Sequence, residues 1–332
     1  MLAGTFTSTT FDSQVLKGNK LGDPTCREVL VYLPPGYDAS TTRFPMVVLL
    51  TGFASTHRST FGYSPWSPNT IEKLDMQIVA GECEPVIVAL PDCTNRWGGS
   101  QFIDSSATGA YQSYLVEVIE HVDATFRTLP ERARRAVVGK SSGGFGALRL
   151  GMDRPEVVSV IGSHAGDAAF DISMRPMLTS AAIAIDRAGG LHAFCEKMAE
   201  SGPRGGNDFD AIFVLASSAA YAPNDGPFPH CDLPVNPSTG EVIEAVWHRW
   251  LAHDPLERVD ACADAIRTMT LIVLDAGTRD EHGLHFGHRL LAERLRAVGA
   301  AAVELNEFDG GHRGTSHRYA LTLPRIAQVL HQ

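Results

Sequence analysis

Residues 135–144 read Arg-Ala-Val-Val-Gly-Lys-Ser-Ser-Gly-Gly, and this stretch decides the fold. Its apolar start predicts a strand over 135–139, and residues 144–152 are typical of a helix. Between the two lies Gly139-Lys140-Ser141-Ser142-Gly143, the pattern G-x-S-x-G. In a strand–turn–helix setting the glycines let the backbone approach itself closely, and the turn raises the serine hydroxyl at the carboxyl end of the strand. We therefore expect Ser141 to be a nucleophile. A glycine- and serine-rich turn without chemistry is the alternative.

Short runs rich in β-branched residues alternate with helical patterns along the whole chain. Residues 46–50 and 86–90 are apolar at every position, as expected of strands that helices cover on both faces. A long amphipathic helix is expected over 111–126, with others over 290–298 and 321–330. This alternation predicts an α/β fold, with a mostly parallel central sheet flanked by helices. An antiparallel edge is expected from 5–15 and 27–33, and the strands themselves over 28–33, 45–50, 85–90, 135–139, 157–162, 270–276 and 301–307.

The composition excludes several classes of protein. Of 332 residues, 44% are hydrophobic and 20% charged, which is incompatible with a disordered chain. Lys and Arg total 28 against 38 Asp and Glu, a net charge of −10, so we expect neither nucleic acid nor an anionic membrane as partner. The six cysteines are scattered and are expected to be reduced thiols. No signal peptide or membrane span is recognisable at the sequence level, and the expected compartment is the cytoplasm.

The chain is longer than one small domain needs, and the excess lies between residues 167 and 269. That stretch has no clear strand and contains clusters of Gly, Pro and Asn, which punctuate loops and short helices. A crossover between parallel strands needs only about 30 residues in all. We therefore expect one domain over 1–332, with a cap-like insertion over 167–269.

A serine hydroxyl needs a base, and the base needs an acid that orients it. In proteins with a G-x-S-x-G turn these partners follow in the order acid, then histidine. Asp280 comes directly after the strand expected over 270–276, and His312 after the strand expected over 301–307. The parallel strands bring all three residues to one edge of the sheet. Competing acids are Asp275, inside its strand, and Glu281.

Attack of a serine hydroxyl on an acyl carbon leaves a negative charge on the carbonyl oxygen. Two backbone N–H donors usually stabilise this oxyanion. One is expected from Ser142, which follows the nucleophile, and the other from Phe53 in the loop after the strand over 46–50. His164 follows another strand and is expected near the site, or else as a hydrogen-bonded structural residue.

A metal site is a rival hypothesis because His282, His285 and His288 are spaced by three. Such spacing turns successive imidazoles about 60° around a helix, so the outer two diverge, unlike the i, i+4 pair of H-E-x-x-H. We expect neither a metal nor a cofactor.

Aromatic residues outside the predicted sheet are candidates for the substrate pocket. Trp66 and Trp97 follow strands at the expected active-site end, and Trp247 and Trp250 close the insertion. Large aromatic side chains there would line an acyl or aryl pocket. The alternative is that they anchor the insertion to the core. Thr51, beside Gly52, is a further candidate contact.

Taken together, the motifs resemble the esterase D-type branch of the α/β-hydrolases, which includes S-formylglutathione hydrolases, feruloyl and enterochelin esterases and mycolyltransferases. The resemblance covers nearly the whole chain. Relatives often carry His-Gly or Ser-Gly where this chain has Thr51-Gly52, which puts substrate contacts at Thr51 in question. The matching segments are 22–24, 31–37, 50–53, 98–100, 139–144, 163–167, 277–280 and 311–312.

The resemblance implies a serine esterase that cleaves carboxylic esters or thioesters through a Ser141–His312–Asp280 triad without a cofactor. The expected partner is a small-molecule ester, and a homodimer is left open. Two rivals remain at this point. The same acyl-enzyme can be resolved by an alcohol in acyl transfer, or the chain is an inactive binding protein.

Overall fold

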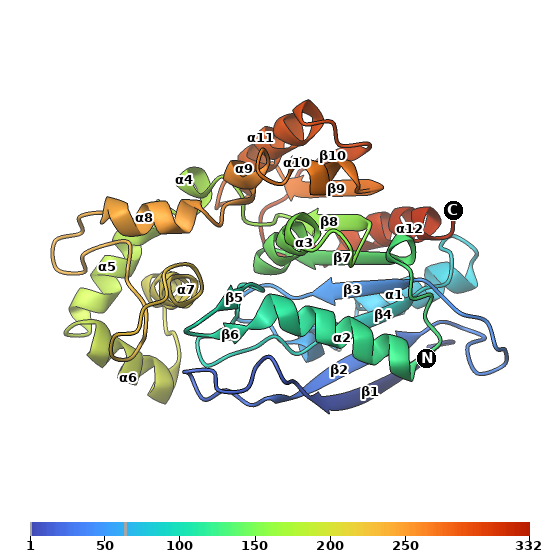
Figure 1. Ribbon diagram of the computed structural model, residues 1–332, viewed down its shortest axis with the longest axis horizontal. Helices are drawn as coiled ribbons and strands as arrows, with labels where there is room; N and C mark the ends of the chain where they lie inside the picture. The colour runs from blue at the N-terminus through green and yellow to red at the C-terminus, as the bar shows by residue number, and fades with distance from the viewer. Residues whose placement is uncertain (1, 63–64) are drawn as a thin grey trace.

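An eight-stranded sheet forms the centre of the computed structural model, which describes residues 2–62 and 65–332 (Figure 1). The strand order is β1-β2-β4-β3-β7-β8-β9-β10. β1 pairs antiparallel with β2, and β2 antiparallel with β4, whereas the remaining neighbours are parallel. The expected mostly parallel sheet with an antiparallel edge is confirmed. The strands are β1 Thr5–Asp12, β2 Cys26–Leu33, β3 Met46–Leu50, β4 Ile87–Pro91, β7 Arg135–Lys140, β8 Val160–His164, β9 Leu271–Gly277 and β10 Val303–Phe308, and a separate pair is β5 Asp104–Ser105 and β6 Gly109–Ala110.

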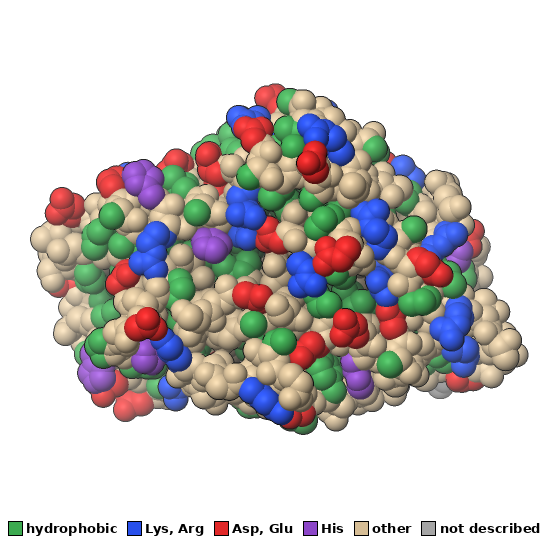
Figure 2. All heavy atoms as spheres, in the orientation of Figure 1, with side chains coloured by type: hydrophobic (Ala, Val, Ile, Leu, Met, Phe, Trp, Pro, Cys, Tyr) green, Lys and Arg blue, Asp and Glu red, His purple; other side chains and the backbone are tan. Residues whose placement is uncertain are grey.

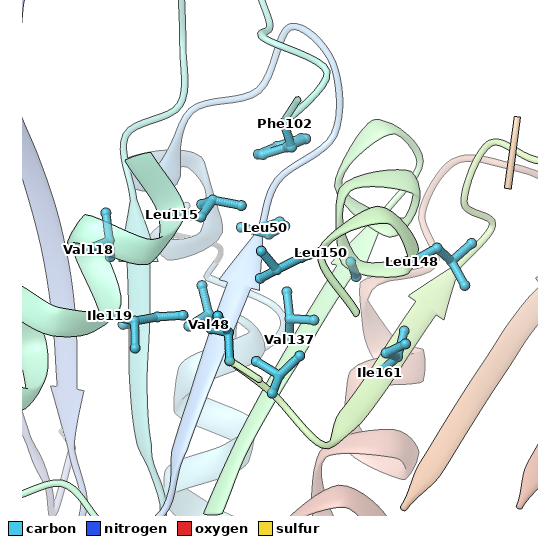
Figure 3. Packing of buried hydrophobic residues seen from close by; sticks show 14 of the residues in the cluster. Val48, Leu50, Phe102, Leu115, Val118, Ile119, Val137, Leu148, Leu150 and Ile161 are labelled. Atoms are coloured by element: carbon cyan, nitrogen blue, oxygen red, sulfur yellow. The ribbon is translucent and has the colours of Figure 1, made fainter. Parts of the chain in front are cut away.

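Helices cover both faces of this sheet, which is why its inner strands are apolar throughout. On one face, α2 (Tyr111–Thr125), α3 (Ser142–Asp153) and α11 (Leu284–Ala297) pack on the strands. Figure 3 shows Ile119 of α2 beside Val48 of β3, and Leu115 of α2 beside Leu50. On the other face, α1 (Thr70–Val79) and α12 (Tyr319–Leu330) cover Val47 and Leu49. Successive strand residues point to opposite faces, so both sets must be apolar.

Residues 167–269, all of which the structure describes, contain seven helices and no strand. Most of these helices lie beyond the carboxyl ends of the strands, at the left of Figure 1. The helices are α4 Phe170–Ser173, α5 Met177–Arg187, α6 Leu191–Ser201, α7 Gly206–Tyr221, α8 Glu244–Leu251, α9 Pro255–Arg258 and α10 Ala263–Arg267. Helices α4 to α8 share a hydrophobic cluster that also includes Trp97 and Phe145, whereas Val259 and Ile266, at α9 and α10, pack in the main core of the sheet.

Several boundaries differ from those expected: the helix expected over 290–298 is α11 (Leu284–Ala297), and the strand expected over 157–162 begins at Val160. Two further differences adjoin the serine turn. β8 continues to His164, because its polar last residues still pair with Lys140 of β7 and Asp275 of β9. The helix after the G-x-S-x-G turn begins at Ser142 rather than at residue 144, so the turn is tighter than the glycine pattern indicates.

The surface carries charges of both signs, and the cysteines form no disulfide, as expected from the sequence. Acidic and basic side chains are interspersed over the face shown in Figure 2. Each of the six cysteines is free, and Cys26 alone among them is exposed. Within the described parts of the chain, no helix combines the length and apolar character that a membrane crossing requires.

Candidate active site

The turn between β7 and α3 holds Ser141 in a strained conformation. Its backbone φ is 56° and ψ is −126°, a region that residues other than glycine rarely adopt. A side chain on Gly139 would place Cβ 2.3 Å from the Gly143 carbonyl, and one on Gly143 would place it 2.4 Å from the Leu50 oxygen. The Ser141 N–H donates to the His164 carbonyl at 2.9 Å. The two glycines are therefore required by close backbone packing, which fixes the serine at the start of α3.

Three side chains from separate loops form one hydrogen-bonded chain at the carboxyl edge of the sheet. His312, in the loop after β10, places Nε2 3.1 Å from Ser141 Oγ. Its Nδ1 lies 2.8 Å from Oδ2 of Asp280, in the loop after β9. The Asp280 side chain is fully buried, and that of His312 is 13% exposed. The structure thus brings together the three residues that the sequence places in separate loops.

The electrostatics of this chain keep Asp280 ionised. Burial alone would raise the pKa of its carboxyl group. Hydrogen bonding to His312 and the charge of that histidine outweigh burial and, with the His282 backbone N–H, lower the pKa of Asp280 below its usual value. A charged acid at Nδ1 holds the imidazole with Nε2 directed at the serine and favours its protonated form.

The two competing acids lie elsewhere. Glu281 Oε2 accepts the backbone N–H of His312 at 2.8 Å and therefore supports the loop rather than the ring. Asp275 is buried within β9 and accepts hydrogen bonds from Arg318, the shortest of which is 2.6 Å. Asp280 is thus the one of the three acids whose side chain is bonded to the His312 ring.

The loop after β3 packs directly against Ser141. A Cβ on Gly52 would lie 3.4 Å from the Ser141 Cβ, so this glycine allows the close approach. Within the described residues, the backbone N–H groups of Phe53 and Ser142 donate to no protein acceptor. Both residues line the same small recess beside Gly52. The Phe53 ring stacks edge-to-face on Phe213, with centroids 5.1 Å apart.

A cavity of about 350 Å³ opens above Ser141 and His312. Its apolar wall comes mostly from the insertion, and its rim carries His282 and Arg313. These lining residues were not predicted from the sequence, although phenylalanines four positions apart on a helix are a recognisable signal of one shared face. The apolar lining residues are Phe53, Ala54, Met174, Met177, Phe209, Phe213 and Leu284.

Asp167 lies in the wall of this cavity and was also missed. It is 6% exposed, and Ser142 Oγ donates a long hydrogen bond of 3.5 Å to its Oδ2. Burial raises the pKa of Asp167 to about 7, and the nearby His312 only partly offsets that effect. Its position just after β8 was the available signal, because it is equivalent to the positions of Asp280 and His312 after their strands.

The tryptophans do not line this cavity. Trp97, Trp247 and Trp250 are at most 2% exposed and belong to the core of the insertion. Trp247 Nε1 donates to Asp171 at 2.9 Å. Trp66 is 92% exposed and lines a separate hollow beside α1. From the sequence, the tryptophans were expected either to line a substrate pocket or to anchor the insertion to the core. In the structure, Trp97, Trp247 and Trp250 are buried anchors.

Two further candidates lie beside the site rather than in the cavity. Thr51 lines two neighbouring hollows, and its hydroxyl donates to the Ser55 carbonyl at 3.3 Å. His164 is buried, with Nε2 2.9 Å from Thr322 Oγ1 and its ring against Tyr319. Its backbone, not its imidazole, touches the serine turn.

The three closely spaced histidines diverge as their spacing implies. His282 packs against His312, with ring centroids 4.9 Å apart, and His285 packs against Phe286. His288 is buried, with Nε2 3.1 Å from both backbone polar atoms of Gly166. Among residues 2–62 and 65–332, no group of three or more His, Cys, Asp or Glu is placed to hold a metal ion.

Known proteins resemble this chain over most of its length. The family model described as "Putative esterase" matches residues 24–322. Esterase Rv1288 of Mycobacterium tuberculosis is 27% identical over 143 residues, which are 42% of this chain and 29% of that protein. The match therefore spans less than a third of the length of that curated relative.

Solved structures share the fold at low identity. A ferulic acid esterase superposes with a TM-score of 0.64 at 15% identity, covering 99% of this chain and 100% of the other. FphF, a fluorophosphonate-binding serine hydrolase of Staphylococcus aureus, superposes with a TM-score of 0.61 at 13% identity, covering 99% of each chain. The fold is that of the α/β-hydrolases, and the resemblance noted in the motifs is confirmed. The family model matches residues 24–322, which are most of this chain, and this match shows that the chain belongs to the esterase family.

Proposed function

We propose that this protein hydrolyses carboxylic esters or thioesters through an acyl-enzyme on Ser141. The observation that carries the proposal is the hydrogen-bonded chain from Ser141 Oγ through His312 to Asp280, with contacts of 3.1 and 2.8 Å. A nucleophile, a base and an orienting acid in this geometry are what acyl transfer needs. Membership of the esterase family supports the same chemistry.

In the first step, Ser141 Oγ attacks the acyl carbon while His312 Nε2 accepts the hydroxyl proton. The carbonyl oxygen gains negative charge, which the backbone N–H groups of Phe53 and Ser142 stabilise. His312 then gives its proton to the leaving alcohol or thiol, and the acyl group stays on Ser141. Asp280 remains ionised throughout and holds the imidazole in register.

In the second step, water takes the place of the leaving group. His312 removes a proton from that water as the oxygen attacks the acyl carbon, and the same two N–H groups stabilise the oxyanion. The bond to Ser141 Oγ breaks, His312 returns the proton to the serine, and the carboxylic acid leaves. No metal or other cofactor enters either step.

The insertion over residues 167–269 acts as a cap that selects the acyl group. Its helices α4, α5 and α7 supply Ser173, Met174, Met177, Phe209 and Phe213 to the cavity over the serine. Thioether and phenyl side chains favour an aliphatic or aryl acyl group by burying apolar surface. The stack of Phe53 on Phe213 links this cap to the loop that supplies an oxyanion donor.

The test is covalent labelling together with turnover. A fluorophosphonate probe should label Ser141 in the wild type, as peptide mapping would detect. Ser141→Ala should lose label and ester hydrolysis while keeping its circular dichroism spectrum. Ser180→Ala is the matched control and should retain both, because Ser180 is half-buried on α5, its hydroxyl donates to Asn207 Oδ1, and it does not line the cavity over Ser141. Wild-type turnover by Ser141→Ala would contradict the proposal, and an unlabelled wild type without activity would favour a binding protein.

A further inference from the structure

A second cavity of about 530 Å³ adjoins the one above Ser141. The two share Gly52, Ser55 and Lys140 as lining residues. Its walls come from the loop after β3, from the start of α1 and from the chain that follows His312. Lys140 directly precedes Ser141 in the chain, and Gly52 packs against Ser141, so the second cavity lies beside the nucleophile. Nothing in the two-step mechanism accounts for this space.

The charge of the second cavity is opposite to that of the protein. The chain carries a net charge of −10, yet none of the described residues that line this cavity is Asp or Glu. Two lysines, Lys73 and Lys140, line it instead, together with His317 and several hydroxyl side chains such as Ser55 and Ser316. An acidic protein therefore holds a cationic hollow beside its nucleophile.

The distribution of lysines makes this cavity distinct. The sequence contains only five lysines. Three of them, Lys17, Lys20 and Lys197, form ion pairs with aspartates. The remaining two are Lys73 and Lys140, and neither makes a side-chain hydrogen bond or ion pair with another described residue. Lys73 and Lys140, which form no ion pair within the described residues, thus line one cavity, although 67 residues separate them in the chain.

The positive charge in the second cavity favours binding of an anion. Burial lowers the pKa of Lys140, because its ammonium group is partly desolvated; Asp280 and Glu281 oppose this effect through space without forming an ion pair. Helix α1 spans ten residues, and its first residue, Thr70, lines the same wall. The capping box of Asn69 and Glu72 already occupies the N-terminus of this helix, so the positive charge of the cavity comes from the two lysines. An anionic oxygen group would supply the counter-charge that the protein does not.

The acid nearest to Lys73 in sequence, Glu72, already accepts a hydrogen bond from the backbone. Glu72 accepts the backbone N–H of Asn69 at 2.8 Å in the N-terminal cap of α1. It lines the separate hollow that contains Trp66, together with Asp75. Neither acid therefore lines the cavity of the lysines, and the positive charge there remains open to a ligand.

We propose that the second cavity binds a carboxylate or phosphate on the leaving alcohol or thiol of the ester. This inference rests on the proposed function. The leaving oxygen or sulfur must lie beside His312 to receive its proton, and Gly314 and Ser316, just after that histidine, form part of the cavity wall. The wall of the first cavity also carries Lys140 and Arg313, but it is richer in apolar side chains than that of the second cavity and includes the buried carboxyl group of Asp167. The two cavities thus divide the substrate into an apolar acyl part and an acidic leaving part.

The test compares three acetyl esters that form the same acetyl-enzyme: para-acetoxybenzoate, para-acetoxyphenyl phosphate and the neutral methyl para-acetoxybenzoate. The readout is kcat/KM for each anionic ester divided by that for the neutral ester. Lys73→Met should lower this ratio about tenfold, the low end for a charge-assisted hydrogen bond near solvent. Lys73→Arg should restore most of the ratio, because it keeps the charge. Lys20→Met, which removes an ion-paired surface lysine, should leave it unchanged.

The carboxylate and phosphate arms show which anion the cavity takes, and a drop in either ratio supports the inference. An unchanged ratio for both anions in Lys73→Met and Lys140→Met would overturn it, while hydrolysis of the neutral ester through Ser141 would leave the proposed function intact. If no ester is cleaved, the proposed function fails separately. In that case, the anion site is tested by measuring the Tm with and without added inorganic phosphate. Phosphate should raise the Tm of the wild type but not that of Lys73→Met, and an equal response of both would refute the site.

Discussion

Replacing Asp280 by asparagine is the sharpest test of the proposed chemistry. The substitution keeps the size of the side chain but removes its charge, and it turns an acceptor toward His312 Nδ1 into a possible donor. Asp280 Oδ2 now lies 2.8 Å from that nitrogen, and Oδ1 accepts the backbone N–H of His282 at 2.9 Å. An amide in the same place favours the tautomer with hydrogen on Nε2, which prevents the ring from accepting the Ser141 proton.

The size of the effect follows from the burial of the pair. The Asp280 side chain is fully buried and that of His312 is 13% exposed, so solvent screens their interaction only weakly. For charge centres about 4 Å apart and an effective dielectric constant of about 20, the interaction of carboxylate and imidazolium is about 4 kcal/mol. That energy stabilises the protonated histidine formed in the transition state. We therefore expect kcat to fall about a thousandfold.

The assay is steady-state hydrolysis of a neutral acetyl ester, with circular dichroism to confirm folding. Glu281→Gln is the matched control, because Glu281 bonds the backbone N–H of the same histidine but not its ring. We expect it to retain activity within about fivefold of the wild type, since removing a peripheral contact of this kind costs about 1 kcal/mol. An Asp280→Asn enzyme with more than a tenth of wild-type kcat, or an equal loss in Glu281→Gln, would refute the assignment of the acid.

Two further predictions concern stability. Gly143→Ala should lower the free energy of unfolding by about 1–3 kcal/mol in urea, because its Cβ would lie 2.4 Å from the Leu50 oxygen. Gly206→Ala, where nothing lies within 4 Å, is the control, and equal losses in both variants would contradict the packing argument. Asp167→Asn should stabilise the protein more at pH 8 than at pH 4. Because burial raises the pKa of Asp167 from 3.8 to about 7, the folded state holds a proton between these values that the unfolded state has lost, and stability falls as pH rises through this window. The difference in stabilisation reaches at most about 4 kcal/mol, and a Tm difference independent of pH would show that Asp167 does not titrate in this range.

The fold followed from the sequence because its signals are local. Residues 46–50 are apolar at every position, and the structure covers both faces of β3 with helices. The end of β8 was misjudged, because Ser163 and His164 are polar and only their pairing with neighbouring strands reveals them as sheet residues. Strand order, too, depends on contacts between residues far apart in the chain.

The tryptophans illustrate what local patterns leave open. Position in the chain places Trp97 after a strand and Trp247 near the end of the insertion, but it does not determine which neighbours their rings meet. In the structure both are buried in the core of the insertion. The apolar lining of the site comes instead from Phe209 and Phe213, whose helix turns this face toward Ser141.

The sequence by itself determined the serine turn, because its geometry depends on five consecutive residues and on glycines that fit where no side chain does. It also placed Asp280 and His312 at strand ends, since parallel strands share one carboxyl edge. The three-dimensional packing was needed to show which acid touches the His312 ring, which residues line the cavity over Ser141, and that Lys73 and Lys140 line one hollow. Those relations join segments tens to hundreds of residues apart, and they arise from packing of side chains that no local spacing encodes.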